Sequence, residues 1–205
     1  MNTGICYIVG AGEIFSLDFQ PTEQDIVIAA DGGYRNLCQA GIRPNLVVGD
    51  FDSLGAAPQG EQVIVLPKVK DVTDTWAAIR EGEARGFRQF FLYGCTGGRL
   101  DHTLANIQTA ADVAARGMEC KIYDKTQIIT AICGGTLHFG TERTGFISVF
   151  SHSDRCTGVC IRGMKYELEQ AELSNRFPLG VSNEFQGVPS EITIGTGTAI
   201  LVYDR

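Results

Sequence analysis

The sequence predicts an α/β protein with a mostly parallel, Rossmann-like sheet flanked by helices, followed by a smaller all-β sandwich. Before about residue 125, short apolar runs alternate with segments of helical periodicity, and polar glycine-rich turns follow the runs. After that point, short alternating runs separated by glycines are typical of antiparallel strands. We therefore expect an α/β domain at residues 1–125 and a β-sandwich domain at residues 126–205.

Six apolar runs are the expected strands of the first domain. We place them at residues 5–9, 26–30, 46–49, 62–66, 89–93 and 120–123. Because the carboxyl ends of parallel strands meet at one edge of a sheet, the polar turns that follow the runs are expected to share that edge. The turn Gly10-Ala11-Gly12 marks the end of the first strand, and without a third glycine it is weak support for a dinucleotide site.

Three segments favour helices. Residues 34–40 end before Gly41, residues after Thr73 continue to about Arg85, and apolar residues at helical spacing run from Leu104 to Ala114. Thr73 is the expected N-cap of the second helix.

The third strand leads into a pair of acidic residues, Asp50 and Asp52. If the extended conformation continues through Phe51, both carboxylates point to the same side of the strand. Oxygen ligands at this spacing suit Mg²⁺ when phosphate oxygens and water complete its shell. The alternative is a solvated turn with Asp52 or Ser53 as a helix N-cap.

Two further polar segments point to phosphate binding. Lys70, Asp71 and Asp74 surround the start of the second helix, where the helix dipole and a nearby lysine favour an anion. The segment Gly97-Gly98-Arg99-Leu100-Asp101-His102 places glycines and a planar charged donor before the third helix. An ordinary tight turn with Asp101 as N-cap is the alternative there, and His102 alone is more typical of a packed or capping histidine than of a base.

Composition limits the partners and the compartment. The 24 acidic residues outnumber the 17 Lys and Arg residues, giving a formal charge of −7, which argues against a nucleic-acid or anionic membrane surface. No apolar run approaches the roughly 20 residues of a membrane span, and no signal peptide is recognisable. The seven cysteines form no paired framework. Free thiols in a reducing compartment are expected, hence a cytoplasmic location.

The order of the polar segments carries a resemblance to a known family. Four segments of the first half and one of the β-rich half stand in a fixed order: Asp31-Gly32-Gly33, Gly49-Asp50-Phe51-Asp52-Ser53, Lys70-Asp71-Val72-Thr73-Asp74, Gly97-Gly98-Arg99-Leu100-Asp101-His102 and Ser182-Asn183-Glu184-Phe185. Through these segments the chain resembles the thiamine pyrophosphokinases from end to end. The resemblance implies a homodimer whose active site lies between subunits. It also implies Mg²⁺-dependent transfer of the terminal diphosphate of ATP to the hydroxyl of thiamine, with release of AMP.

The resemblance also assigns residues by position. The carboxylates that it implies for Mg²⁺ are Asp50, Asp52 and Asp74, with Asp71 as a nearby acid. The residues that it implies for ATP are Asp31, Gly32, Lys70, Gly97, Gly98, Arg99 and Asp101. Those that it implies for thiamine are Ser182, Asn183 and Tyr166, the last through packing of its ring on the cationic substrate. Tyr34 and Arg35 depart from the family pattern and receive no role.

Two questions stay open at the level of sequence. The group that accepts the proton of the thiamine hydroxyl is Asp71, Asp101 or water. The rival functions are a diphosphokinase for another hydroxymethyl heterocycle, such as a pterin, and a non-catalytic sensor of nucleotide or thiamine. Three intact metal carboxylates argue against the sensor, because a pure binding protein has no need of them.

Overall fold

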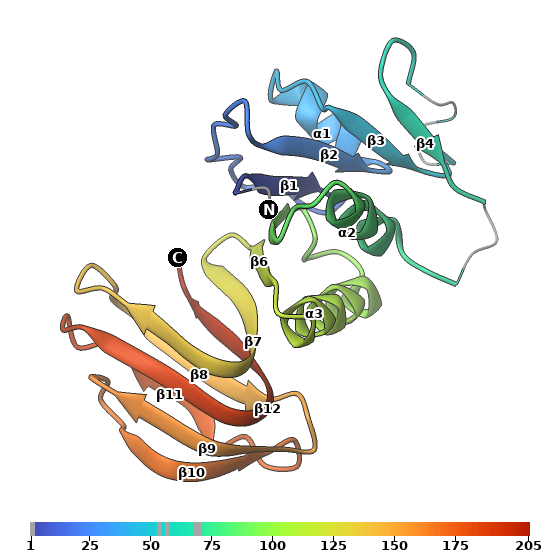
Figure 1. Ribbon diagram of the computed structural model, residues 1–205. Helices are drawn as coiled ribbons and strands as arrows, with labels where there is room; N and C mark the ends of the chain where they lie inside the picture. Colours follow the sequence, from blue (N-terminus) through green and yellow to red (C-terminus); the bar gives the residue numbers. More distant parts are fainter. Residues whose placement is uncertain (1–2, 53–54, 56–57, 68–70) are drawn as a thin grey trace. The chain divides into compact units, whose positions relative to one another are not determined.

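The computed structural model describes residues 3–52, 55, 58–67 and 71–205. The described residues form three helices and twelve strands (Figure 1). The helices are α1 (Gly33–Gln39), α2 (Asp74–Ala84) and α3 (Leu100–Ala115). The strands are β1 (Ile5–Val9), β2 (Ile26–Ala30), β3 (Leu46–Gly49), β4 (Val63–Val65), β5 (Gln89–Tyr93), β6 (Glu119–Tyr123), β7 (Gln127–Phe139), β8 (Phe146–Ser151), β9 (Arg155–Arg162), β10 (Leu168–Ser174), β11 (Gly180–Glu184) and β12 (Ser190–Asp204).

The chain divides into two compact units and is a mixed α/β protein, which confirms the predicted α/β class at this coarse level; it has few helices. The first unit comprises Met1–Thr109 and Cys120–Lys125, and the second comprises Ala110–Glu119 and Thr126–Arg205. In the first unit β1 pairs in parallel with β2 and β5, β2 with β3, and β3 with β4. In the second unit the strand pairs are antiparallel.

Both faces of the first unit's strands are covered by helices, which explains their continuous apolar sequences. Tyr7 and Val9 of β1 belong to a buried cluster that includes Leu37 of α1. Cys6 points to the other face, against α2, where a Cβ on Gly82 would lie 2.7 Å from the Cys6 sulfur. The two helices therefore pack on opposite faces, and Gly82 permits the close approach of α2.

The start of α2 follows its capping signal, whereas the start of α3 does not follow the apolar spacing. Thr73 is the N-cap of α2 as predicted, and its hydroxyl accepts a hydrogen bond from Trp76 N at 3.1 Å. In contrast, α3 begins at Leu100, before the apolar positions that start at Leu104, and Leu100 is 71% exposed. None of the described helices is long and apolar enough to cross a membrane.

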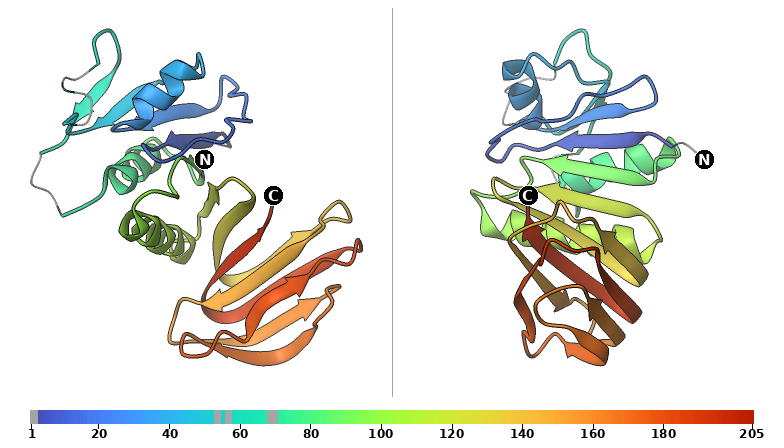
Figure 2. Two further views of the ribbon diagram at one scale, coloured as in Figure 1. Left: turned by 180° about the vertical axis from the view of Figure 1, so that it is seen from behind. Right: turned by 90° about the vertical axis from the view of Figure 1, so that its left-hand side faces the viewer.

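The second unit is organised around the long antiparallel pair β7 and β12. The register of this pair shifts between Ile194 and Thr198, where Gly195 and Gly197 interrupt β12. Before the shift β12 pairs with β9, and after it β12 pairs with β8 (Figure 2). One strand thus contributes to both halves of this unit, with β10 on the outside of β9 and β11 on the outside of β8.

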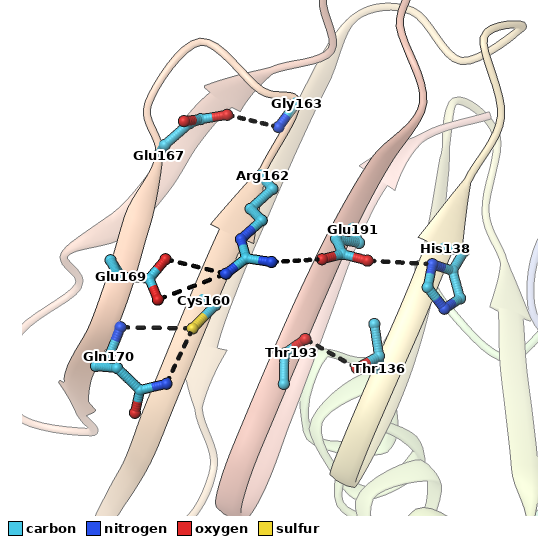
Figure 3. A network of polar contacts seen from close by, with 10 residues as sticks. All are labelled: Thr136, His138, Cys160, Arg162, Gly163, Glu167, Glu169, Gln170, Glu191 and Thr193. Atoms are coloured by element: carbon cyan, nitrogen blue, oxygen red, sulfur yellow. Dashed lines mark hydrogen bonds and ion pairs between the residues drawn. The ribbon is translucent and has the colours of Figure 1, made fainter.

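Polar side chains line the outer face of β10, β9, β12 and β7 (Figure 3). Arg162 lies between Glu169, at 3.3 Å, and Glu191, at 3.5 Å, and Glu191 also contacts His138 at 3.5 Å. The neighbouring positions Ile161 and Ile192 point inward and are buried. This alternation is what a sheet with one solvated face requires, and such exposed ion pairs contribute little to stability.

Candidate active site

A cavity of about 650 Å³ lies in the first unit, beside the carboxyl ends of β1, β2, β3 and β5. The N-terminal ends of α2 and α3 complete its wall, through residues such as Asp74 and His102. This is where an open α/β sheet binds its ligands. The cavity collects residues from five segments that are far apart in sequence.

Two glycine turns form one side of the cavity by direct contact between backbones. Gly10 N donates to Tyr93 O at 2.8 Å, and Gly12 N donates to Gly94 O at 2.8 Å. A Cβ on Gly12 would lie 2.6 Å from Thr96 O, so no larger residue fits. The turn at residues 10–12 therefore contributes to the cavity itself, beyond marking the end of β1.

Four acidic residues line the cavity: Asp31, Asp50, Asp71 and Asp74. Asp31 follows β2 with φ at 45°, and a Cβ on Gly49 of β3 would lie only 3.0 Å from the Asp31 Cα. Asp74 occupies the first turn of α2, where the helix dipole favours negative charge. The ends of two strands and one helix thus bring carboxylates into one cavity. Gly32, also predicted for ATP, is the N-cap of α1 and is not among the described lining residues.

The backbone between Asp50 and Asp52 does not continue as a strand. β3 ends at Gly49, and Phe51 has a φ of 60° with its ring buried. Asp50 Oδ1 accepts a hydrogen bond from Asp52 N at 3.2 Å, which closes a turn. The condition for both carboxylates to point to one side, an extended backbone through Phe51, is therefore not met. Asp50 lines the cavity, whereas Asp52 is not among its described lining residues.

The loop before α3 brings consecutive left-handed glycines and a guanidinium to the cavity. Gly97 and Gly98 have φ values of 74° and 59°, and both line the cavity with Arg99. Asp101 binds Arg99 through two hydrogen bonds of 2.6 and 3.2 Å, and it is not among the described lining residues. The hydrogen bonds from Arg99 hold the pKa of Asp101 below its usual value. Because α3 already starts at Leu100, Asp101 is not its N-cap.

Three polar residues of this region are part of the site without having been predicted for it. His102 and Asn106 line the cavity, and with Arg99 they follow a helical i, i+3, i+7 spacing, the sequence signal that could have grouped them. Thr96 also lines the cavity, and its hydroxyl donates to Asp124 Oδ1 at 2.5 Å. Asp124 follows β6, and nothing in its local sequence indicates this contact.

A buried cysteine in the cavity wall is chemically inert at neutral pH. Burial raises the pKa of the Cys95 thiol to about 12. The thiol rather than the thiolate is therefore present, and the thiolate is the nucleophilic form. Burial therefore disfavours Cys95 as a covalent nucleophile.

The cavity carboxylates suit a metal ion that phosphate and water also bind. Among the residues that the structure describes, no three His, Cys, Asp or Glu side chains are grouped closely enough to hold a metal by themselves. Mg²⁺ usually binds through one or two carboxylates, with phosphate oxygens and water completing its octahedron. The cavity carboxylates fit that mode of binding and do not form a closed protein cage.

The residues predicted for thiamine lie in the second unit. Asn183 is buried and clamps the backbone of Tyr166: its Oδ1 accepts from Tyr166 N at 2.9 Å and its Nδ2 donates to Tyr166 O at 2.7 Å. Ser182 is exposed with φ at 59°, and its N donates to Ser148 Oγ at 3.1 Å. Tyr166 is 59% exposed, and the Lys165 ammonium lies 5.5 Å from the centre of its ring. Lys70 and Ser53 lie outside the described residues.

Known proteins resemble this chain along nearly its whole length. A relative named thiamine pyrophosphokinase from Bacillus subtilis (strain 168) is 26% identical over 187 residues, covering 88% of this chain and 87% of the relative. The crystal structure of thiamine pyrophosphokinase from Bacillus subtilis covers 98% of both chains at 26% identity with a TM-score of 0.88. That of the Geobacillus thermodenitrificans protein covers 98% of this chain and 97% of its own at 27% identity with a TM-score of 0.85.

Two family descriptions match consecutive parts of the sequence. Residues 21–122 match "Thiamin pyrophosphokinase, catalytic domain", which includes the acidic turns and the loop before α3. Residues 136–201 match "Thiamin pyrophosphokinase, vitamin B1 binding domain". The chain belongs to the thiamine pyrophosphokinase family.

Proposed function

We propose that this enzyme transfers the terminal diphosphate of ATP to the hydroxyl of thiamine, giving thiamine diphosphate and AMP. The main support for this proposal is the set of residues that line the cavity. It joins four carboxylates to the loop Gly97-Gly98-Arg99 at the start of a helix. Diphosphate transfer needs positioning and charge neutralisation more than covalent chemistry, and these are the groups that supply both.

The loop before α3 is the proposed binding site for the phosphates. Glycines with positive φ and no Cβ allow backbone N–H groups to approach phosphate oxygens, and the start of α3 adds the positive end of a helix dipole. The Arg99 guanidinium is a planar donor that matches phosphate geometry. Lys70, Asp31 and Gly32 belong to the same proposed nucleotide site by their position in the family pattern.

Asp50 and Asp74 are the proposed Mg²⁺ ligands within the cavity, with Asp52 added by its place in the family pattern. Mg²⁺ bound there would supply neutralisation of the phosphate charge. For the proton of the thiamine hydroxyl we favour Asp71 over Asp101. Asp71 lines the cavity, whereas Asp101 is bound to Arg99 and its lowered pKa makes it a weaker base.

The second domain is proposed to bind thiamine and to form a homodimer whose active site lies between subunits. Ser182 and the exposed Tyr166 ring are the groups proposed to meet the cationic substrate, with Asn183 holding the segment in shape. A mixture of Asp50→Asn and Ser182→Trp protomers tests the arrangement. Activity recovered on mixing supports a shared site, and no recovery in mixed dimers contradicts it.

We also propose a Rossmann-like first domain and a β-sandwich second domain. The parallel pairs among β1 to β5 support a Rossmann-like domain at residues 1–125, and the antiparallel pairs support a β-sandwich at residues 126–205. We also propose a cytoplasmic location, supported by seven free cysteines.

A turnover assay with ATP, Mg²⁺ and thiamine tests the proposed function. AMP and thiamine diphosphate should appear together. ADP with thiamine monophosphate would mean single phosphoryl transfer instead. Thiamine binding without any product would favour a sensor, and product only with a hydroxymethyl pterin would favour the rival diphosphokinase.

A further inference from the structure

A buried side-chain amide forms a hydrogen bond to the backbone of the loop Gly94–Arg99. Asn106 lies in the second turn of α3, is only 5% exposed, and donates from Nδ2 to Cys95 O at 2.7 Å. Cys95 is two residues before Gly97 and four before Arg99. The hydrogen bond therefore joins the helix that follows the loop to the second residue of the loop.

The glycines of this loop give it little conformational preference of its own. Gly97 and Gly98 both have positive φ, and a Cβ on Gly98 would meet nothing within 4 Å. The loop thus gains no side-chain packing at Gly98 and depends on contacts of its other residues, which include the hydrogen bond from the Thr96 hydroxyl to Asp124. Glycine populates many backbone conformations, so fixing this one has an entropic cost that other contacts must offset.

We propose that Asn106 is a positioning residue that sets the conformation of the Gly97-Gly98-Arg99 loop through its hydrogen bond to the Cys95 carbonyl. This inference rests on the proposed role of that loop in binding the phosphates of ATP. Asn106 acts through the backbone of the loop and the placement of Arg99. Preorganised groups bind a developing charge better than groups that must be ordered at the moment of reaction.

Asn106→Ala removes the amide and is the first variant to test. We expect kcat/KM for ATP to fall about tenfold, with the KM for thiamine changed less than about twofold, because a lost hydrogen bond to a buried carbonyl loosens the phosphate site. Asn106→Asp keeps the shape of the side chain and removes the Nδ2 donor, so it should lose at least as much. Wild-type ATP kinetics in a folded Asn106→Asp enzyme would overturn the proposal.

Thr109→Ala is the matched control on the same helix. Thr109 is also buried, but its hydroxyl bonds to Ala105 O at 2.8 Å within α3 and does not reach the loop. The control should lose some stability and keep its ATP kinetics. Equal kinetic losses in the Thr109→Ala and Asn106→Ala enzymes would indicate a general effect on α3 and contradict a role through the loop.

A double-mutant cycle separates action through the loop from direct contact with the nucleotide. Gly98→Ala disturbs the φ preference of the loop without a clash. If Asn106 acts through the loop, the combined loss in Gly98→Ala with Asn106→Ala is smaller than the product of the single losses. Independent, multiplying losses would mean that Asn106 contacts the nucleotide itself and would overturn the proposal.

Amide hydrogen exchange of residues 94–99 gives a readout that does not require turnover. Exchange in this loop should be faster in Asn106→Ala than in Thr109→Ala at equal global stability. A wild-type protein without diphosphate transfer would contradict the proposed function, while faster exchange would still support the hydrogen bond's role in the loop. Unchanged exchange in Asn106→Ala would contradict that role, even if the wild-type enzyme is fully active.

Discussion

Arg99 and Asp101 form a two-point ion pair at the start of α3, with Nη2 2.6 Å from Oδ2 and Nε 3.2 Å from Oδ1. Arg99 lines the cavity. Asp101 binds the Arg99 guanidinium and is not among the described residues that line the cavity. The pair lowers the pKa of Asp101 and raises that of Arg99, so both groups stay charged over a wider pH range. Asp101 is therefore better suited to orient Arg99 than to accept a proton.

Replacing Asp101 by Asn distinguishes these two roles. Asp101→Asn should lower kcat/KM for ATP about tenfold, because Arg99 loses its charged partner, and leave the shape of the pH–rate profile unchanged. Removal of a general base would instead cost about 10²–10⁴-fold and alter the profile. Asp112→Asn is the control, because Asp112 forms a similar ion pair with Arg116 away from the cavity. This variant should leave kcat/KM for ATP unchanged.

The acidic turn after β3 predicts unequal effects of its two carboxylates. Asp50→Asn should raise the Mg²⁺ concentration needed for half-maximal rate at least about tenfold, because Asp50 lines the cavity. Asp52→Asn should abolish most turnover, because the family pattern places Asp52 among the Mg²⁺ ligands. The folded state of both variants is checked by circular dichroism and thermal unfolding.

Near-normal activity in a folded Asp52→Asn enzyme would remove Asp52 from the metal site and leave Asp50 in place. Near-normal activity and Mg²⁺ dependence in Asp50→Asn would contradict the proposed metal site.

The sequence predicts the strands and helices well and the orientation of single side chains less well. Apolar runs such as residues 5–9 and the cap at Thr73 are local signals, and the structure confirms them. The left-handed φ of Phe51 is not visible in sequence, because a bulky residue rarely adopts this conformation. The contact of Asn106 with the Cys95 carbonyl depends on how α3 returns over the loop, which no local pattern reveals.

Asn183 illustrates a second limit of the sequence. Its position in the family pattern implies substrate binding, but its amide is engaged by the backbone of Tyr166 and by Glu184 N at 2.9 Å. Asn183→Ala should therefore lower the free energy of unfolding by roughly 2–3 kcal/mol, since buried backbone groups lose their partners. Ser182→Ala should leave stability nearly unchanged and raise the KM for thiamine more than that for ATP.

Urea unfolding and steady-state kinetics of the two variants check this division. Equal effects of Ser182→Ala on the two KM values would argue against its placement near thiamine. Unchanged stability of Asn183→Ala would contradict the clamping role.

Asp25 makes folding stability depend on pH. Its Oδ1 accepts from Ile5 N at 2.6 Å, and its Oδ2 accepts from Thr22 N and Thr22 Oγ1, each at 2.8 Å. Partial burial alone would raise the pKa of Asp25, but these hydrogen bonds lower it below its ordinary value. The carboxylate therefore stabilises the fold above the unfolded-state pKa of about 3.9, and this stabilisation is lost as the pH falls through the lower folded-state pKa.

Asp25→Ala should destabilise the protein by roughly 1–3 kcal/mol near neutral pH, and the difference from wild type should shrink below about pH 4. Urea denaturation at several pH values measures it. Glu23→Ala, which changes an exposed carboxylate two residues away, serves as the control. A difference for Asp25→Ala that stays constant with pH would show that its charge is not involved.

The most direct test of diphosphate transfer follows the phosphorus atoms of ATP. The enzyme is incubated with thiamine, Mg²⁺ and ATP labelled at either the α- or the β-phosphorus. Transfer of the terminal diphosphate as one unit predicts that the β-label appears in thiamine diphosphate while the α-label stays in AMP. Recovery of the β-label in ADP, with unlabelled thiamine monophosphate as the product, would contradict it.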